Sequence, residues 1–236
     1  MDSKKCNCSN TSCGCNVGSS CCTTSTRSIY NSSRALIGKK APEFSGTAWH
    51  GKAFKNIKLS DYKGKWVVLF FYPMDFTFVC PTEICQFSDH GEKFKSLNTE
   101  IIGCSVDSKH SHREYALKPR EEGGLSPLAI PLLSDMSHEI SIDYGVLIEE
   151  GGDRGASYRG TFIIDPAGIL RQLSINDTSV GRNVEEVIRL LQGFQFVEKY
   201  GEVCPSKWKP GDRTMVPDQE SDITKKYFAE IMAKKD

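Results

Sequence analysis

An unbroken apolar run occupies residues 66–72, where the sequence reads Trp-Val-Val-Leu-Phe-Phe-Tyr. Its aromatic and β-branched side chains predict a buried β-strand. Three further strands are predicted over residues 100–105, 160–165 and 168–175. The tetrapeptide Asp-Pro-Ala-Gly at residues 165–168 joins the last two and is typical of a hairpin turn.

Residues 183–199 show a different periodicity, because their apolar side chains recur every three or four positions. This spacing predicts an amphipathic helix. Further helices are predicted over residues 82–97 and 111–117, and a charged one around residues 222–234. A strand, a helix and a strand, followed by a hairpin and a closing helix, indicate an α/β fold with helices flanking the sheet.

The first 34 residues differ from the rest of the chain in composition. They are rich in Ser, Thr, Asn and Cys, and they hold six of the ten cysteines. Such a segment buries too little apolar surface to offset the entropy lost on ordering, so residues 1–34 are predicted to form a disordered extension. We expect residues 35–200 to form one globular domain and residues 201–236 to form a C-terminal arm.

Composition and charge exclude several classes of function. Lys plus Arg and Asp plus Glu number 30 each, so nothing points to nucleic acid or to an acidic membrane surface. No apolar run approaches the roughly 20 residues of a membrane-spanning helix. Lys4 and Lys5 are not followed by the apolar stretch of a secretory signal. These features predict a cytoplasmic protein whose cysteines are mainly thiols.

Cys80 is the candidate reactive residue, because it lies where the strand at 66–72 gives way to a helix. Pro81 suits the first turn of a helix, and Thr82 and Glu83 follow it. Unpaired N–H groups and the positive end of the helix dipole both favour the thiolate, which is the reactive form. The alternative is a buried, inert cysteine, the commoner fate of a lone thiol.

Two motifs in this chain resemble those of the peroxiredoxins, in particular the typical two-cysteine group. Pro73, Thr77 and Cys80 match the signature Pro-x-x-x-Thr-x-x-Cys, and the segment Gly-Glu-Val-Cys-Pro at residues 201–205 is similar to that group's resolving-cysteine segment. The resemblance extends from about Ala35 to Phe228. It implies a thioredoxin-like fold, in which helices flank a central mixed β-sheet and a C-terminal arm follows.

The resemblance also implies a reaction cycle. Cys80 would attack hydrogen peroxide or an organic hydroperoxide and become a sulfenic acid, which a second thiol traps as a disulfide. That thiol would be Cys204 of the partner subunit in an antiparallel homodimer, with a decamer as a further assembly. A thioredoxin-type dithiol would then reduce the disulfide. The cycle needs no metal, haem or flavin.

Five more site residues follow from the resemblance: Thr77, Pro73, Arg159, Arg182 and Glu83. Thr77 would offer its hydroxyl to the incoming oxygen, and Pro73 would shield the thiolate from water. Arg159 and Arg182 correspond to the family's active-site arginines, and Glu83 could orient Arg182 through a bidentate pair. Taken alone, the threonine could be a turn residue, the proline a strand end and each arginine a surface residue. Arg154, close in sequence, is expected to be one of the latter.

The remaining cysteines and histidines have plainer interpretations. Cys85 and Cys104 are expected to fill the core. His110 and His112 form a weak metal pattern, and a solvated helix start explains them better. The six N-terminal cysteines allow two interpretations with about equal support. They could form a tail that binds soft metal ions or is thiol-reactive, or a mobile tail whose redox activity is incidental.

The C-terminal part departs from the pattern of oxidation-sensitive family members. The Tyr227-Phe228 pair is present, but the Gly-Gly-Leu-Gly loop reads Gly-Gly-Leu-Ser at residues 123–126. We therefore expect partial sensitivity to hyperoxidation.

Three rival functions are weighed against the peroxidase. A thiol–disulfide oxidoreductase is disfavoured because the chain has no Cys-x-x-Cys pair. A cysteine hydrolase would need a histidine base, and none of the five histidines lies in a recognisable motif. A chaperone or peroxide-sensing role is plausible as an addition.

Overall fold

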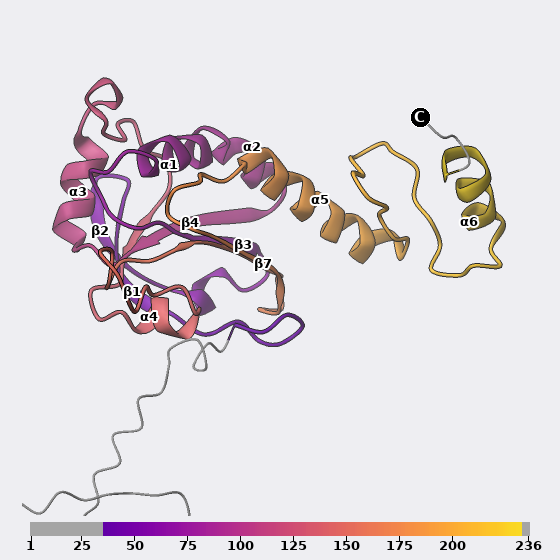
Figure 1. Ribbon diagram of the computed structural model, residues 1–236, viewed down its shortest axis with the longest axis horizontal. Helices are drawn as coiled ribbons and strands as arrows, with labels where there is room; N and C mark the ends of the chain where they lie inside the picture. The colour runs from indigo at the N-terminus through magenta and orange to yellow at the C-terminus, as the bar shows by residue number, and fades with distance from the viewer. Residues whose placement is uncertain (1–34, 233–236) are drawn as a thin grey trace, which may run out of the picture.

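The computed structural model describes residues 35–232, so the predicted extension and its six cysteines lie outside the described residues (Figure 1). One mixed sheet has the order β2-β1-β5-β4-β3-β6-β7, which confirms the predicted α/β class with helices flanking the sheet. Its strands are β1 (Ser45–His50), β2 (Ala53–Lys58), β3 (Trp66–Phe71), β4 (Thr99–Ser105), β5 (Leu132–Ser134), β6 (Arg159–Ile164) and β7 (Leu170–Asn176).

The helices lie between and after these strands. They are α1 (Cys80–Asp89), α2 (Gly91–Ser96), α3 (Lys109–Leu117), α4 (Glu139–Asp143), α5 (Val184–Tyr200) and α6 (Asp222–Tyr227). Two short 3-10 helices, η2 (Leu59–Tyr62) and η3 (Arg120–Glu122), and a π-helical turn, η4 (Phe228–Met232), complete the elements.

Strand β3 is the centre of the sheet, and all six of its residues are buried. It runs parallel to β4 and antiparallel to β6, with Phe70 paired with Thr161 and Val67 with Ile164. Antiparallel pairing places the carboxyl end of β3 beside the amino end of β6. Residues that follow β3 in the chain therefore lie next to residues that begin β6.

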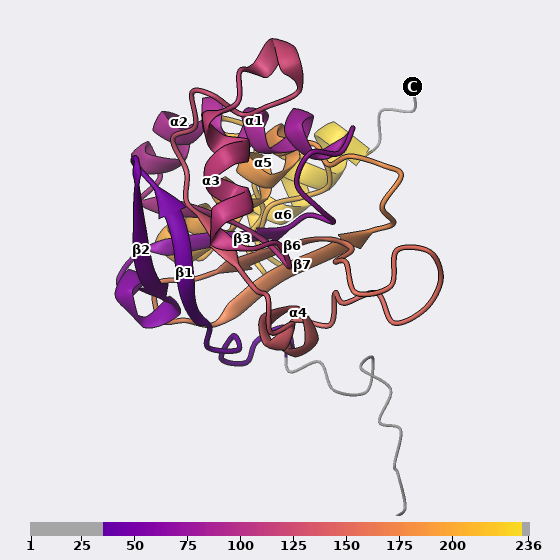
Figure 2. The ribbon, with the colours of Figure 1, turned by 90° about the vertical axis from the view of Figure 1, so that its left-hand side faces the viewer.

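Two hydrophobic cores lie on the two faces of the sheet, as expected for a strand buried on both sides. One core contains Phe70 and Tyr72 together with Cys80, and it packs beneath α1, α2 and α5. The other contains Phe71, Cys104 and Ile140 of α4. Figure 2 shows α1, α2 and α5 on one side of the sheet and α4 on the other.

The predicted helix over residues 82–97 is wrong in one respect, because it is two helices. α1 begins at Cys80, and the backbone at His90 leaves the helical region (φ −84°, ψ 6°) just before Gly91. The predicted helix at 183–199 is confirmed as α5. Asn183 caps it by accepting hydrogen bonds from the N–H groups of Glu185 and Glu186.

Three strands and one α-helix were not predicted: β1, β2, β5 and α4. β1 and β2 form a hairpin through Gly51 and Lys52, whose φ angles are +57° and +72°. Two successive residues with positive φ form the tight turn whose twist matches that of a β-hairpin. Such turns usually contain Asn, Asp or Gly at both positions, and Lys52 departs from that pattern, so the sequence did not reveal the turn. β5 and α4 have only three and five residues, too few to show a periodicity.

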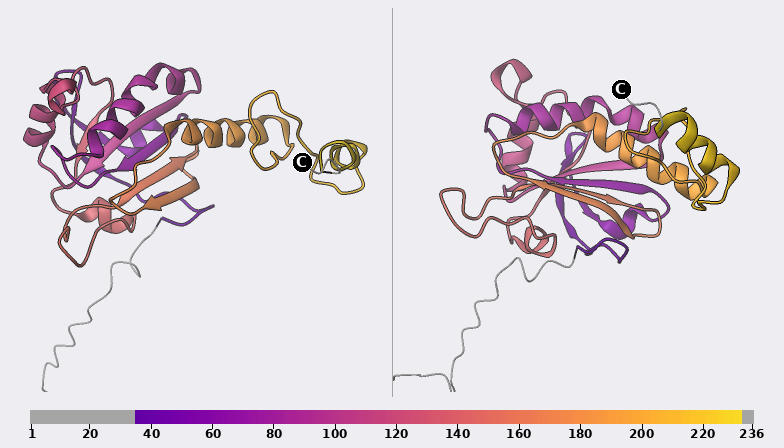
Figure 3. Two further views of the ribbon diagram at one scale, coloured as in Figure 1. Left: turned by 45° about the horizontal axis from the view of Figure 1, so that its top comes forward. Right: turned by 45° about the vertical axis from the view of Figure 1, so that its right-hand side comes forward.

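The C-terminal arm continues beyond α5 and leads away from the sheet (Figures 1 and 3). Trp208 anchors its first part: the indole is 2 % exposed and its centroid lies 5.1 Å from that of Phe196. Arg189 of α5 donates a hydrogen bond of 3.0 Å to the Trp208 carbonyl. The charged helix predicted around residues 222–234 is α6 followed by the π-helical turn η4.

Candidate active site

Cys80 is the first residue of α1, and it is 0 % exposed. Its Sγ accepts a hydrogen bond of 3.5 Å from Nη1 of Arg159. The backbone N–H groups of Thr82 and Glu83, expected to face the sulfur, point instead to the carbonyl of Val79. The donor that reaches the sulfur is therefore the guanidinium of Arg159, and not the backbone N–H groups of Thr82 and Glu83.

Arg159 reaches the sulfur because β6 begins beside the carboxyl end of β3. Its Nη1 also donates a bond of 2.5 Å to Oε2 of Glu83, and its Nε donates one of 2.8 Å to the carbonyl of Thr178. These bonds hold the guanidinium from both sides. The side chain is 3 % exposed, so water screens its charge little.

Glu83 links Arg159 to the second predicted arginine. Arg182 donates to the two carboxylate oxygens of Glu83 from Nε (2.7 Å) and Nη2 (3.0 Å), and its backbone N–H donates a third bond of 2.8 Å. The bidentate pair that the sequence suggested is present. Nη1 of Arg182 donates to the carbonyl of Gly160 at 2.7 Å, and its Cζ lies 5.3 Å from the ring centre of Phe70.

The charges of this cluster balance when the cysteine is ionised. Two guanidiniums and the one carboxylate of Glu83 leave a net positive charge, which a thiolate at Cys80 neutralises. Because Glu83 and both arginine side chains are almost fully buried, the thiolate is the partner that completes the cluster. The arrangement therefore places a net positive charge beside the sulfur, which is the setting in which reactive cysteines are found.

A cavity of about 320 Å³ lies beside this cluster and is lined in part by Pro73, Thr77, Val79 and Arg159. The structure thus places both remaining predicted residues at one opening, with the Arg159 guanidinium in its wall. The Thr77 hydroxyl donates to the carbonyl of Met74 at 3.0 Å. Cys80 is not among the residues that line the cavity, but Arg159, which contacts its sulfur, is.

The structure does not bring Cys204 to Cys80 within one chain. Cys204 lies on the arm beside the middle of α5, where its Sγ donates to the carbonyl of Gly193 at 3.8 Å. The arm leads away from the start of α1 (Figures 1 and 3). Partial burial raises the pKa of the Cys204 thiol, and the charge of Arg189 opposes that shift.

Two expectations about neighbouring residues need correction or refinement. The interpretation of a solvated helix start is wrong for His112, which is fully buried, whereas His110 is exposed. Cys104 fills the core as expected, and burial raises the pKa of its thiol. Cys85 is only half-buried at the margin of a core. Arg154 is exposed, as expected.

The loop at 123–126 follows α3 and the Tyr227-Phe228 pair lies at the end of α6, and Figure 1 shows these two helices at opposite sides of the molecule. Within residues 35–232, no cluster of three or more His, Cys, Asp or Glu side chains could hold a metal ion. In the same range, no helix has the length and apolar character needed to cross a membrane.

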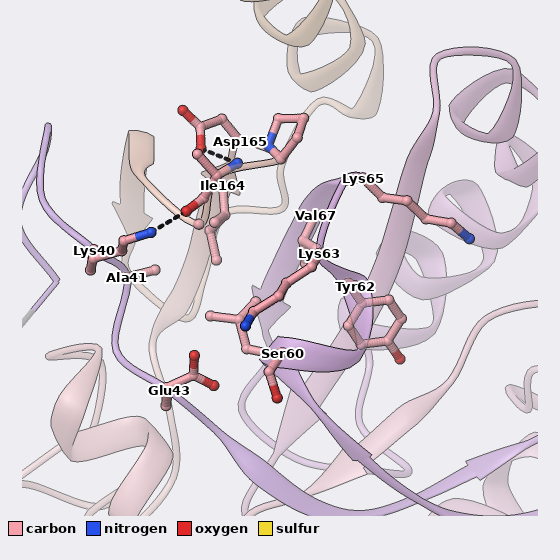
Figure 4. A pocket seen from close by; sticks show the side chains of 14 residues that line it. Lys40, Ala41, Glu43, Ser60, Tyr62, Lys63, Lys65, Val67, Ile164 and Asp165 are labelled. Carbon is pink, nitrogen blue, oxygen red and sulfur yellow. Dashed lines mark hydrogen bonds between the residues drawn. The ribbon is translucent and has the colours of Figure 1, made fainter.

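A second cavity, of about 250 Å³, lies at the opposite end of β3 (Figure 4). Apolar side chains such as Val67 and Ile164 form its floor, and Lys40, Glu43 and Lys63 lie around it. Lys40 donates a hydrogen bond to the carbonyl of Ala167. No cysteine or histidine is among the residues that line this cavity.

Comparisons with known proteins identify the family of this chain. Residues 37–173 match the AhpC/TSA family, and residues 193–230 match the C-terminal domain of 1-Cys peroxiredoxin. Peroxiredoxin-2 of Rattus norvegicus is 56% identical over 198 residues, which cover 84% of this chain and 98% of that protein. Peroxiredoxin-4 of Rattus norvegicus is 54% identical over 199 residues, which cover 84% of this chain and 71% of the relative.

Solved structures give the same result. The reduced form of Plasmodium vivax 2-Cys peroxiredoxin has a TM-score of 0.75 and 41% identity, covering 78% of this chain and 94% of that one. These findings confirm the predicted thioredoxin-like fold and the predicted thiol peroxidase function, an oxidoreductase activity on peroxides. The chain belongs to the peroxiredoxin family, in its typical two-cysteine group.

Proposed function

We propose that Cys80 is the residue that this peroxidase oxidises. Its thiolate attacks one oxygen of the peroxide, a sulfur–oxygen bond forms, and the oxygen–oxygen bond breaks. The other oxygen leaves as water or an alcohol after taking up a proton, and the sulfur becomes a sulfenic acid. The observation that carries the proposal is the contact of 3.5 Å between Sγ and Arg159, inside a cluster whose charge a thiolate completes.

The two arginines position this reaction. Negative charge moves from the sulfur toward the leaving oxygen, and fixed donors near that path stabilise it. Arg159 serves as such a donor from the wall of the cavity, while Arg182 and Glu83 fix its place. Thr77 would exchange its bond to the Met74 carbonyl for one to the peroxide. Pro73 has no N–H group to bind water, and its ring shields the sulfur at the opening from solvent.

The second half of the cycle takes place between subunits. Cys204 of a second copy attacks the sulfenic acid, a disulfide forms, and water leaves. Two features support a homodimer: the arm carries Cys204 away from its own Cys80, and in the described chain β7 pairs with β6 alone, so its other edge is open. A thioredoxin-type dithiol then reduces the disulfide. The decamer, the organic hydroperoxides and the cytoplasmic location stay predictions.

The test combines peroxide consumption with non-reducing electrophoresis after a peroxide pulse. We expect Cys80→Ser to abolish consumption, and Cys204→Ser to allow one oxidation without a dimer band. Cys85→Ser serves as the control, because Cys85 is a free thiol on the same helix, and it should behave as the unaltered chain. A dimer band that persists without Cys204, or turnover that persists without Cys80, would overturn the proposal.

A further inference from the structure

The cavity at the far end of β3 is framed by three segments that are distant in the sequence: residues 40–44, 59–67 and 164–168 (Figure 4). Backbone hydrogen bonds of 2.9 to 3.1 Å join each pair of segments, namely Ala41 to Gly168, Leu59 to Phe44 and Gly64 to Pro166. Because every wall is tied to the other two, the cavity is part of the fold and needs no ligand to form. Preformed concave sites of this kind are where small molecules bind.

The floor of this cavity is aliphatic. Val67 of β3 and Ile164 of β6 are paired in the sheet, and Ala41 and Leu59 line the cavity with them. All four side chains are buried. The volume of about 250 Å³ lies just below the range of roughly 300–1,000 Å³ that is usual for ligand sites. The floor therefore suits the apolar body of a small molecule.

Two of the charged groups around the cavity are already neutralised. Lys65 forms an ion pair with Glu100 at 2.6 Å, and Figure 4 shows its side chain extending away from the cavity. Asp165 forms an ion pair with Arg171 at 2.7 Å. Neither group needs a ligand to balance its charge.

Lys40, Lys63 and Glu43 are the charged groups that remain at the rim. Within residues 35–232, none of the three forms an ion pair. Lys40 donates to the carbonyl of Ala167, which does not neutralise its charge. In Figure 4, Lys63 extends toward Lys40 and Glu43. Two ammonium groups and one carboxylate leave one positive charge beside the aliphatic floor.

We propose that this cavity binds a small monocarboxylate with an aliphatic chain. The chain packs on Val67 and Ile164, and the carboxylate lies between the ammonium groups of Lys40 and Lys63. A single negative charge balances the rim, whereas the roughly −1.5 to −2 charge of a phosphate monoester would exceed it beside Glu43. A lysine ammonium is a compact point charge, so it can pair with a carboxylate without a fixed geometry. This site is separate from the cluster around Cys80 and does not depend on the proposed cycle.

The test is a titration of the full chain with octanoate, followed by NMR of labelled valine, leucine and isoleucine methyl groups. We expect the signals of Val67, Leu59 and Ile164 to shift and to saturate with a Kd of about 1 mM or tighter, because a ligand of about ten non-hydrogen atoms reaches that affinity with modest efficiency per atom. 1-Octanol has the same chain and no charge, so it should shift these signals several-fold less at equal concentration.

Lysine variants test the role of the rim charges. Lys63→Gln should weaken octanoate binding about threefold, and the double variant Lys40→Gln/Lys63→Gln about tenfold, since each ammonium is exposed and screened by water. Lys65→Gln is the matched control, because this lysine also lines the cavity but is paired with Glu100. This variant should bind octanoate as the unaltered chain does.

Two further methyl-bearing residues report on where the ligand lies. Val79 lines the cavity beside Arg159, whose guanidinium is also a cation, and Ile188 belongs to the core on the other face of the sheet. Neither signal should shift. Signals that move at Val79 or Ile188 in place of Val67 would assign octanoate to the peroxide cavity or to non-specific association, and would overturn the proposal.

The remaining outcomes decide in the same way. No saturable shift of Val67 and Ile164 up to about 10 mM octanoate, about tenfold above the expected Kd, would overturn the proposal. Equal losses of affinity in Lys63→Gln and Lys65→Gln, or equal shifts with 1-octanol, would do so as well, because the rim charges would then have no role. Lys63 is exposed, so its variant should fold, and it decides alone if the double variant does not.

Discussion

Glu83 joins both arginines of the active site, and its removal tests whether that link matters. Glu83→Gln preserves the size of the side chain and removes its charge. The carboxylate now accepts four hydrogen bonds, one from Arg159 and three from Arg182. An amide would direct its NH₂ group at a guanidinium donor, and two buried positive charges would lose their partner.

The expected magnitudes follow from this burial. Removing one member of a buried ion pair costs about 3–5 kcal/mol, so we expect the free energy of unfolding to fall by that amount. The rate constant for peroxide reduction should fall by about 10²-fold, because misplacement by about 1 Å has that effect on a positioned group. The fall should occur even though the substitution increases the net positive charge beside the sulfur of Cys80.

The assay compares kcat/KM for hydrogen peroxide with the midpoint of denaturant unfolding, for the unaltered chain, Glu83→Gln and Glu83→Asp. The aspartate keeps the charge and withdraws it by one methylene, so it should be intermediate in both measurements. If Glu83→Gln retained kcat/KM within about twofold, the arginines would need no orientation by Glu83, and this account of the cluster would be refuted.

Three further predictions concern other parts of the chain. Trp208→Ala should slow disulfide formation about tenfold and expose the arm to proteolysis, since the indole anchors the segment that carries Cys204; unchanged kinetics would contradict this. Gly124→Ala should lower the free energy of unfolding by about 1–3 kcal/mol, because an added Cβ would lie 2.1 Å from the Lys118 carbonyl oxygen; an unchanged urea midpoint would contradict it. Burial raises the pKa of Cys204. The pH at which iodoacetamide modifies this thiol at half its maximal rate should therefore be higher in the native chain than in the unfolded chain. Coincident pH profiles would show that the packing of the arm does not affect the thiol.

The sequence was sufficient to single out Cys80 as the candidate nucleophile, because an apolar strand, a cysteine and a proline follow one another closely in the chain. It could not place Arg159 beside Cys80 without the family resemblance, since 79 residues separate them. That contact depends on the antiparallel pairing of β3 with β6, which no local pattern specifies. The sequence also predicted backbone N–H groups that face the sulfur. Whether they do depends on how the first turn of α1 is oriented relative to the cysteine side chain, and secondary-structure propensities do not determine that orientation.

The burial of His112 carried a signal that was overlooked. Tyr115 and Ala116 follow it at spacings of three and four residues and are also buried, so the three share one face of α3. A histidine aligned with an aromatic residue in this way points to the core rather than to solvent. The short elements β5 and α4 gave no comparable signal, because tertiary pairing rather than sequence periodicity forms them.

The pairing of β3 with β6 also determines where this protein can tolerate changes in length. The connection at residues 149–158 leads into β6, and residues 150–152 in it are exposed and do not line the cavity beside Arg159. Insertions there would lengthen the outer rim without altering strand register. A single residue inserted within β6 would shift its side chains by about 3.4 Å and turn each to the other face. Natural or engineered variation should therefore accumulate in that connection and spare the strand.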